Sequence, residues 1–220
     1  MDDPVQIATF VDAQFGENAY VVWRREGGPC WIVDPGLPPS DTQIRRHVEQ
    51  KSLAPEALIL THGHLDHIAG VPAILKAFGT VAVYMADAAK GALVDPGENL
   101  SADFGLPVVV GPIATVDLAA GQTLTLDGSR WKVLDTSGHS PGGRSLYCGE
   151  VGIVIVGDAL FQGSIGRTDF HHSDHALFIH NIKEKLLSLP DETLVYSGHG
   201  PVTTIGAERA SNPFLQGPLV

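Results

Sequence analysis

The first 90 residues alternate short apolar runs with turn signals. Runs of strand length, rich in branched and aromatic residues, occupy residues 5–11, 19–24, 31–33, 56–60 and 81–85. Ser40 opens a capping-box pattern that predicts the start of a helix. After the fourth run, apolar residues recur at helical spacing over 68–78, and Pro72 falls in the first turn, where proline is tolerated. This alternation of strands and helices predicts an α/β fold.

The second half is dominated by hairpins. Its predicted strands are residues 122–126 and 130–134 around Asp127-Gly128, residues 145–147 and 152–156 around Gly149-Glu150, and residues 193–197. Ser173 is the predicted N-cap of a helix with a buried apolar stripe, and Pro190 ends it. Residues 91–111 are rich in Gly, Pro and acids and show no period, so we expect an insertion near the mouth of the site, either functional or a passive loop.

Length and composition predict one globular domain over residues 1–220. Apolar residues make up 44% of the chain, and no run approaches the length of a membrane span or of a signal core, so we expect a cytoplasmic protein with no membrane partner. The formal charge of −11 argues against nucleic acid as a partner. Cys30 and Cys148 are isolated in strand-like runs and are expected to be buried, inert thiols. The sequence does not fix the oligomeric state.

Most of the candidate metal ligands lie in one loop. His62, His64, Asp66 and His67 lie within six residues, between a predicted buried strand and a helix, which is where α/β sheets place ligands. Imidazole nitrogens and carboxylate oxygens both suit zinc or iron. His62 and His64 are two residues apart and can hold one ion, whereas Asp66 and His67 can point to a second ion. A solvated histidine-rich loop is the alternative.

The same order of apolar strand, small residue and ligand occurs three more times. It places His139, Asp158 and His199 just past predicted strands at 130–134, 152–156 and 193–197. Sorting the ligands by donor type gives one group of His62, His64 and His139 and a second of Asp66, His67 and His199, with Asp158 left to bridge them. Three protein ligands with a bridge and a water is the open coordination of a catalytic site.

These motifs resemble those of the metallo-β-lactamase superfamily, whose H-x-H-x-D-H signature His62 to His67 match in full. Val33-Asp34-Pro35-Gly36, Gly138-His139-Ser140-Pro141-Gly142 and Gly157-Asp158 occur in the expected order. The run from Gly157 to Phe170, the run from Ser197 to Gly206 and the tail from Asn212 to Leu215 are similar to the short glyoxalase II group, the hydroxyacylglutathione hydrolases without a separate C-terminal helical domain.

The resemblance implies a four-layer αββα sandwich and two divalent metal ions, zinc first, with iron or manganese as alternatives. It also implies an aspartate under the histidine cluster, and we expect Asp34 to brace that loop through backbone hydrogen bonds. The implied substrate is an anionic small molecule, S-D-lactoylglutathione or a related acylglutathione. Longer glyoxalase II enzymes bind glutathione partly through the C-terminal domain, and we expect no such domain here because about twenty residues follow His199.

The leading hypothesis is therefore a binuclear thioester hydrolase. A water bridging the ions would lose a proton near neutral pH, its pKa falling from about 15.7 to around 7, and Asp66 would orient the hydroxide. Arg144 is a candidate clamp for a substrate carboxylate, or else a surface arginine at a strand edge.

Three alternatives stay open. A mononuclear iron persulfide dioxygenase would use His62, His139 and Asp158, and that family shares the 166–170 run of this chain. A lactonase or β-lactamase-like hydrolase is less favoured, because β-lactamases of this fold commonly have cysteine near the position of Asp158. A metal-free binding protein would have lost ligands, and none are lost.

The 169–175 segment departs from the subgroup. His172 stands where the subgroup usually has proline. His171, His172 and His175 form either a third metal site or a solvated turn before a helix. The neighbouring Arg167 and Asp169 are expected to pair and hold the preceding loop.

Overall fold

The first sheet is built from the N-terminal half of the chain. In this computed structural model, which describes residues 3–79 and 81–216, the sheet has the order β1-β2-β3-β4-β5-β6. Its strands are β1 (Gln6–Val11), β2 (Asn18–Trp23), β3 (Pro29–Val33), β4 (Ala54–Ile59), β5 (Ala82–Met85) and β6 (Thr115–Asp117). The first three strands pair antiparallel, and β3 to β6 pair parallel.

The second sheet is built from the C-terminal half and has the order β12-β11-β10-β9-β8-β7. Its strands are β7 (Thr123–Leu126), β8 (Ser129–Asp135), β9 (Arg144–Cys148), β10 (Ile153–Gly157), β11 (Leu194–Ser197) and β12 (Thr203–Thr204). Only β10 and β11 pair parallel, and the other neighbours are antiparallel. Both hairpins predicted in this half are confirmed.

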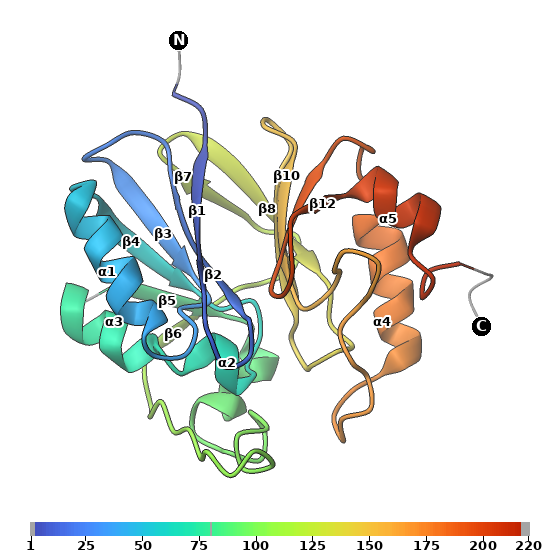
Figure 1. Cartoon of the computed structure of the whole chain (residues 1–220), viewed down its shortest axis with the longest axis horizontal. Helices are drawn as coiled ribbons and strands as arrows, with labels where there is room; N and C mark the ends of the chain where they lie inside the picture. The colour runs from blue at the N-terminus through green and yellow to red at the C-terminus, as the bar shows by residue number, and fades with distance from the viewer. Residues whose placement is uncertain (1–2, 80, 217–220) are drawn as a thin grey trace.

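Helices cover the outer faces of the two sheets (Figure 1). On the first sheet lie α1 (Ser40–Gln50) and α3 (Val71–Phe78); on the second lie α4 (His175–Asn181), its π-helical continuation η2 (Ile182–Leu186) and α5 (Ile205–Ser211). The short α2 (Leu65–Ile68) and the 3₁₀ helix η1 (Asp87–Leu93) lie at the lower end of the sheets. The layers run helix, sheet, sheet, helix, which confirms the predicted αββα sandwich.

Alternate residues of each strand supply different layers of the core. On β2 and β3, Val21 and Ile32 face the helices, whereas Val22 and Trp31 face the second sheet. Between the sheets, the rings of Trp31 and Trp131 have centroids 5.9 Å apart. Strands buried on both faces are continuous apolar runs, which is why β2, β3 and β10 were readable from sequence.

Several details differ from the sequence predictions. Ser40 lies inside α1 and its side chain makes no capping hydrogen bond, so the capping box is wrong. Asp174, not Ser173, caps α4 by accepting from the Leu177 amide. The helix predicted over 68–78 is divided at Gly70, where an added Cβ would lie 2.6 Å from the Pro35 carbonyl oxygen. Strands β6 and β12 and helix α5 were not predicted, because their own sequences are short or weakly patterned.

Both cysteines are buried and free, as expected. Burial raises the pKa of the Cys30 thiol to about 12, which keeps it protonated and unreactive. Among the residues that the structure describes, no helix is both long and apolar enough to cross a bilayer.

The contact between the sheets gives a test of stability. Trp131 is fully buried, and its indole nitrogen donates to Ser129 Oγ at 3.1 Å. Trp131→Ala should lower the free energy of unfolding by about 3–5 kcal/mol, because it leaves a large cavity between the sheets. Trp131→Phe should lower the free energy of unfolding by a smaller amount. Val116→Ala, at a position 47% exposed, should change the free energy of unfolding by no more than about 0.5 kcal/mol. Urea denaturation measures all three, and near-equal midpoints would contradict the assignment.

Candidate metal centre

The seven predicted ligands converge at one end of the sandwich. His62 and His64 follow β4, Asp66 and His67 lie on α2, and the remaining three, His139, Asp158 and His199, follow β8, β10 and β11. Each therefore stands at or beyond the carboxyl end of a strand, and the topology brings these ends to one rim. Their ligand atoms fall into two close groups: His62, His64, His139 and Asp158, and Asp66, His67 and His199.

The histidines of the first group direct ring nitrogens at one another. His64 Nδ1 lies 3.1 Å from His62 Nε2 and 2.9 Å from His139 Nε2. Two nitrogens on one zinc ion, each bonded at about 2.1 Å with tetrahedral angles, lie about 3.4 Å apart. The three lone pairs therefore converge as on a shared cation, and His64 uses its Nδ1 atom for this purpose.

Asp158 lies between the two groups. Its Oδ2 atom is 3.5 Å from both His139 Nε2 and His199 Nε2, and its Oδ1 atom is 3.3 Å from His67 Nε2. Asp66 Oδ2 closes the second group at 3.3 Å from His199 Nε2. One carboxylate thus faces both ligand groups, which is the arrangement of a bridging ligand.

Two buried atoms of this centre show that a cation fits it. His67 Nε2 and Asp158 Oδ1 are buried and face each other at 3.3 Å, and neither makes a hydrogen bond. Leaving a buried polar atom unpaired costs about 1–3 kcal/mol, so such atoms rarely persist without a partner. Imidazole and carboxylate are donors suited to divalent transition metals. The residues present therefore fit a pair of metal ions.

The outward ring nitrogens of three ligands are held by hydrogen bonds. His139 Nδ1 donates to the Arg167 carbonyl oxygen at 2.7 Å, His67 Nδ1 to Asp34 Oδ2 at 3.0 Å, and His62 Nδ1 lies 3.1 Å from Thr61 Oγ1. Such contacts fix the tautomer of each imidazole and leave the other nitrogen free for metal. Ser173 contributes here, because its hydroxyl donates to the backbone oxygen of His139.

Asp34 lies directly beneath the histidine loop. It accepts hydrogen bonds from the Thr61 amide at 2.8 Å and from the Thr61 hydroxyl at 2.6 Å, in addition to that from His67. Its φ of 46° is in the left-handed region, which aspartate tolerates better than most residues. This strained turn at the end of β3 directs the carboxylate under both ligand groups.

Burial and neighbouring charges shift the pKa values of the candidate ligands in different directions. Burial lowers the pKa of His62 and His64 well below the usual value, which keeps both imidazoles neutral. Burial alone would raise the pKa of Asp158, but the charge of His67 and hydrogen bonding with His199 lower it well below its usual range. Burial would lower the pKa of His67 and His199, but the carboxylates of Asp158 and Asp66 raise it above its usual value, so these two imidazoles would each release a proton when a metal ion binds.

Glu17 is a component that sequence reasoning missed. Its side chain is fully buried with Oε1 3.9 Å from His67 Nδ1, and burial raises the pKa of its carboxyl well above the usual value. Its backbone pairs with that of His199 across the two sheets. From sequence, a glutamate in the Gly16-Glu17-Asn18 turn is expected to be exposed. The long-range backbone pairing with His199 is what buries it.

Arg144 does not line the cavity described next. Its guanidinium donates to Asp135 Oδ1 at 3.0 Å and to the carbonyl oxygens of Leu118 and Gly143 at 3.1 and 2.9 Å. These acceptors come from the chain segments next to β9, and the side chain is 13% exposed. Of the two roles open from sequence, this placement favours the structural one.

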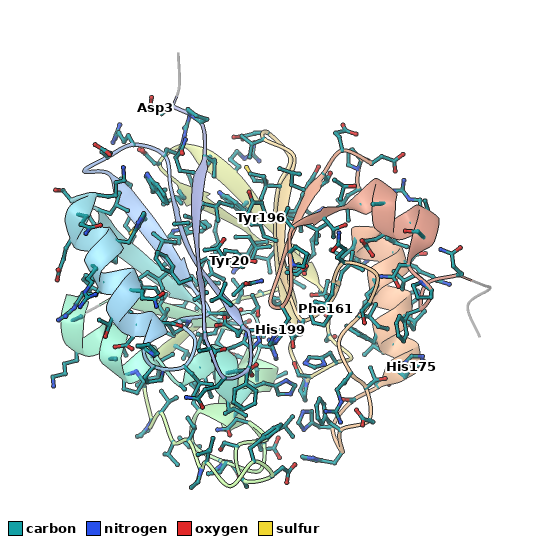
Figure 2. The ribbon with its side chains drawn as sticks, viewed as in Figure 1. Asp3, Tyr20, Phe161, His175, Tyr196 and His199 are labelled. Carbon is teal, nitrogen blue, oxygen red and sulfur yellow. The ribbon has the colours of Figure 1, made fainter. Side chains whose placement is uncertain are left out.

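A cavity of about 340 Å³ opens beside the metal centre. Its floor includes His64, Asp66, His139, Asp158 and His199, and its walls are mostly apolar: Phe15, Leu65, Leu100, Phe104, Phe161, Ile165 and Phe170, with Ser164, Gly166 and Arg167. In Figure 2, Phe161 and His199 lie close together below the central strands, with ring centroids 5.7 Å apart. Substrate in this cavity would reach the ligands directly.

An αββα sandwich with two histidine–aspartate ligand groups sharing a carboxylate defines a class of metal-dependent hydrolases. The chain belongs to the metallo-β-lactamase superfamily, whose family model matches residues 13–199. The resemblance noted from the motifs is thereby confirmed, and the protein is a hydrolase of this superfamily.

Relatives and solved structures agree with this membership. The chain is 39% identical over 201 residues to the probable metallo-hydrolase YqgX of Bacillus subtilis, covering 91% of this chain and 92% of the relative. It is 36% identical over 202 residues to the hydroxyacylglutathione hydrolase GloC of Haemophilus influenzae, with coverage of 91% and 93%.

Two solved structures are similar over nearly the whole fold. The B3 metallo-β-lactamase BLEG-1 has a TM-score of 0.90 at 37% identity, covering 96% of this chain and 100% of that one. The structure of TTHA1623 in a di-iron-bound form has a TM-score of 0.82 at 35% identity, covering 94% and 100%.

Gly198 provides a test of the shared carboxylate. A Cβ at this position would lie 2.2 Å from Asp158 Oδ1 and 2.9 Å from His67 Cε1. Gly198→Ala should therefore displace Asp158 and reduce bound metal from about two ions per chain to one or fewer. Gly91→Ala, whose Cβ would meet no atom within 4 Å, is the matched control. Elemental analysis after desalting measures the loss; full metal content in Gly198→Ala would contradict the bridging position of Asp158.

Proposed function

We propose that this hydrolase is a binuclear, metal-dependent thioesterase acting on S-D-lactoylglutathione or a related acylglutathione. The observation that carries the proposal is the position of Asp158, shared by two ligand groups on the floor of a cavity. The similarity to a relative named as a hydroxyacylglutathione hydrolase supports the substrate class.

The proposed cofactor is a pair of divalent ions, zinc in the first instance. His62, His64 and His139 would hold one ion, Asp66, His67 and His199 the other, and Asp158 would contact both. When bound, the ions would activate water and polarise the thioester carbonyl. A similar structure in a di-iron form supports iron as an alternative.

The residues around the ions have separate tasks. Asp66 is 8% exposed and lines the cavity, which supports a role for its carboxylate in orienting the attacking hydroxide. The leaving thiolate has a pKa near 8.5, so no strong general acid is required. The buried Cys30 and Cys148 lie outside the cavity lining, which is consistent with a mechanism without a thiol nucleophile.

The cavity walls would select the substrate. Phe104, from the 91–111 segment, packs edge-on against Phe15 with centroids 5.2 Å apart, and both line the cavity. Arg167 also lines it, paired to Asp169 and lying 4.8 Å from the centroid of the Phe170 ring. We infer that Arg167, rather than Arg144, meets the anionic end of the thiol substrate.

Metal removal tests the thioesterase directly. The two-metal protein should hydrolyse S-D-lactoylglutathione faster than lactone, β-lactam or glutathione persulfide probes, and chelation should abolish the reaction until metal is restored. Asp158→Ala should lower kcat/KM at least about a hundredfold, because it removes a ligand common to both groups. Thiol release with 5,5′-dithiobis(2-nitrobenzoate) monitors turnover of the thioester, and ring opening of the lactone and β-lactam probes is followed by their ultraviolet absorbance.

Three experimental results would each contradict the thioesterase proposal and identify a different activity. One iron per chain with oxygen uptake on glutathione persulfide would establish the dioxygenase alternative. Fastest turnover of a lactone would identify a lactonase. Fastest turnover of a β-lactam would agree with the name of BLEG-1, the similar B3 structure.

Phe104 tests whether the 91–111 segment contributes to binding. Phe104 is 50% exposed, so Phe104→Ala should leave stability nearly unchanged. It should raise KM for acylglutathiones about three- to tenfold and alter kcat little, because it removes an aromatic wall but no reacting group. Val109→Ala, at a position 59% exposed on the same segment and outside the cavity lining, is the control. Equal KM values for both variants would show the segment to be passive.

A further inference from the structure

The outward nitrogen of His64 has an unusual partner. The corresponding nitrogens of His62, His67 and His139 contact a hydroxyl, a carboxylate and a carbonyl, whereas His64 Nε2 lies 3.3 Å from His172 Nε2. His172 is half-buried in the turn before α4. A histidine in this place can bind a metal ion through its second nitrogen.

The second nitrogen of His172 faces another histidine. His172 Nδ1 lies 3.2 Å from His171 Nε2, and the rings have centroids 4.4 Å apart at 79°. His62 and His64, in the catalytic group, have nitrogens 3.1 Å apart and ring centroids 4.6 Å apart at 81°. The peripheral pair therefore reproduces the geometry of a pair of metal ligands, near the spacing of about 3.4 Å expected on zinc.

Glu98 completes the cluster from a different part of the chain. Glu98 belongs to the 91–111 segment, and one ligand atom from each of Glu98, His171 and His172 lies within 4.8 Å of the others. His175 is not part of this group: its Nδ1 contacts Thr168 Oγ1 at 2.8 Å, and Figure 2 shows it at the lower end of α4. Of the two readings open from sequence, a metal site is favoured, with Glu98 in place of His175.

We propose that Glu98, His171 and His172 form a peripheral site for a divalent transition-metal ion, in addition to the two ions of the catalytic centre, and that its occupation breaks the hydrogen bond between His64 and His172. Two imidazoles and a carboxylate suit zinc, which would complete its coordination with water. The ligands are solvent-accessible, so this ion would exchange more readily than the catalytic pair.

The peripheral ion affects His64 through the tautomers of His64 and His172. His64 must carry its proton on Nε2 because Nδ1 faces the catalytic group, so Nε2–H donates to His172 Nε2. His172 then carries its proton on Nδ1. An ion on His172 Nδ1 displaces that proton to Nε2, with no net gain or loss of protons. Two N–H groups then face each other across 3.3 Å, and the support for His64 is lost.

The ion would also join the two segments that wall the cavity. Leu100 and Phe104 come from the segment that carries Glu98, and Arg167 and Phe170 lie just before His171. Figure 1 shows the segment after η1 and the segment before α4 reaching the lower part of the molecule. A metal between them would restrict how far the mouth of the cavity can open.

Zinc titration of the two-metal protein tests the site. Isothermal calorimetry and elemental analysis should detect a third equivalent, bound more weakly than the first two. Glu98→Gln and His171→Ala should weaken the third equivalent at least tenfold and leave the first two in place. His180→Ala, which removes an exposed histidine on α4 away from the cluster, should bind as wild type does.

Two further readouts test the coupling. Long-range ¹H–¹⁵N spectra should show His172 changing from the Nδ1–H to the Nε2–H tautomer as the third equivalent binds. Over the same zinc range, turnover should fall about two- to tenfold in wild type and stay constant in His171→Ala, which should keep its basal activity.

Different experimental results would overturn the site and the coupling. Binding of only two ions, or an unchanged third equivalent in both ligand variants, overturns the site. A third ion without the tautomer change overturns the coupling. Metal counting and spectra need no substrate, so failure of the thioesterase assay would not affect them.

Discussion

A single buried carboxylate organises the functional end of this molecule. Asp158 must contact both ligand groups, and the conformation of the backbone around it allows these contacts. The ladder between β10 and β11 shifts register between Ile155 and Gly157, which turns the chain at the strand end. Gly157 has a φ of +51° and lies so close to Thr61 that a Cβ would be 2.3 Å from its hydroxyl oxygen. Gly198 leaves space on the other side. The glycines of this centre are therefore required by contact with ligands and their supports.

The two sheets depend on each other for the geometry of the centre. His199 belongs to the second sheet, but residues of the first sheet hold its loop in place. Asn18 Nδ2 donates to the carbonyl oxygens of Ser197 and Gly200, and the Tyr20 hydroxyl donates to Ser197 at 2.6 Å. Tyr20 also packs against Tyr196, close to which it lies in Figure 2. Assembly of the centre therefore requires that the two sheets pack together, since neither ligand group can form within a single sheet.

The sequence predicted what depends on local pattern. The strands that precede the ligands are apolar, as in β10, or alternate apolar with polar residues, as in β8, and a small residue stands before each ligand, so both strand and ligand were visible. Features that depend on contacts between distant parts of the chain could not be predicted from the sequence. Glu17 is buried because its backbone pairs with His199, and the role of Arg144 depended on acceptors that other segments of the chain supply. The two serine caps failed for the same reason: Ser40 lies within its helix, and Ser173 hydrogen-bonds to His139.

The ligand set itself cannot account for substrate choice, because its donors would polarise a thioester, a lactone or a β-lactam alike. Discrimination must come from groups that touch the substrate outside the reacting centre. In this chain these groups lie on two segments: 91–111, which supplies Leu100 and Phe104, and the turn before α4, which supplies Arg167 and Phe170. Both are loop segments outside the two sheets, and loops on a rigid scaffold are where binding residues are commonly found. His172 lies in the second of these segments and contacts His64 directly. A change in the wall can therefore reach the metal centre through one hydrogen bond, which couples specificity and catalysis in a way that the ligand motif alone does not reveal.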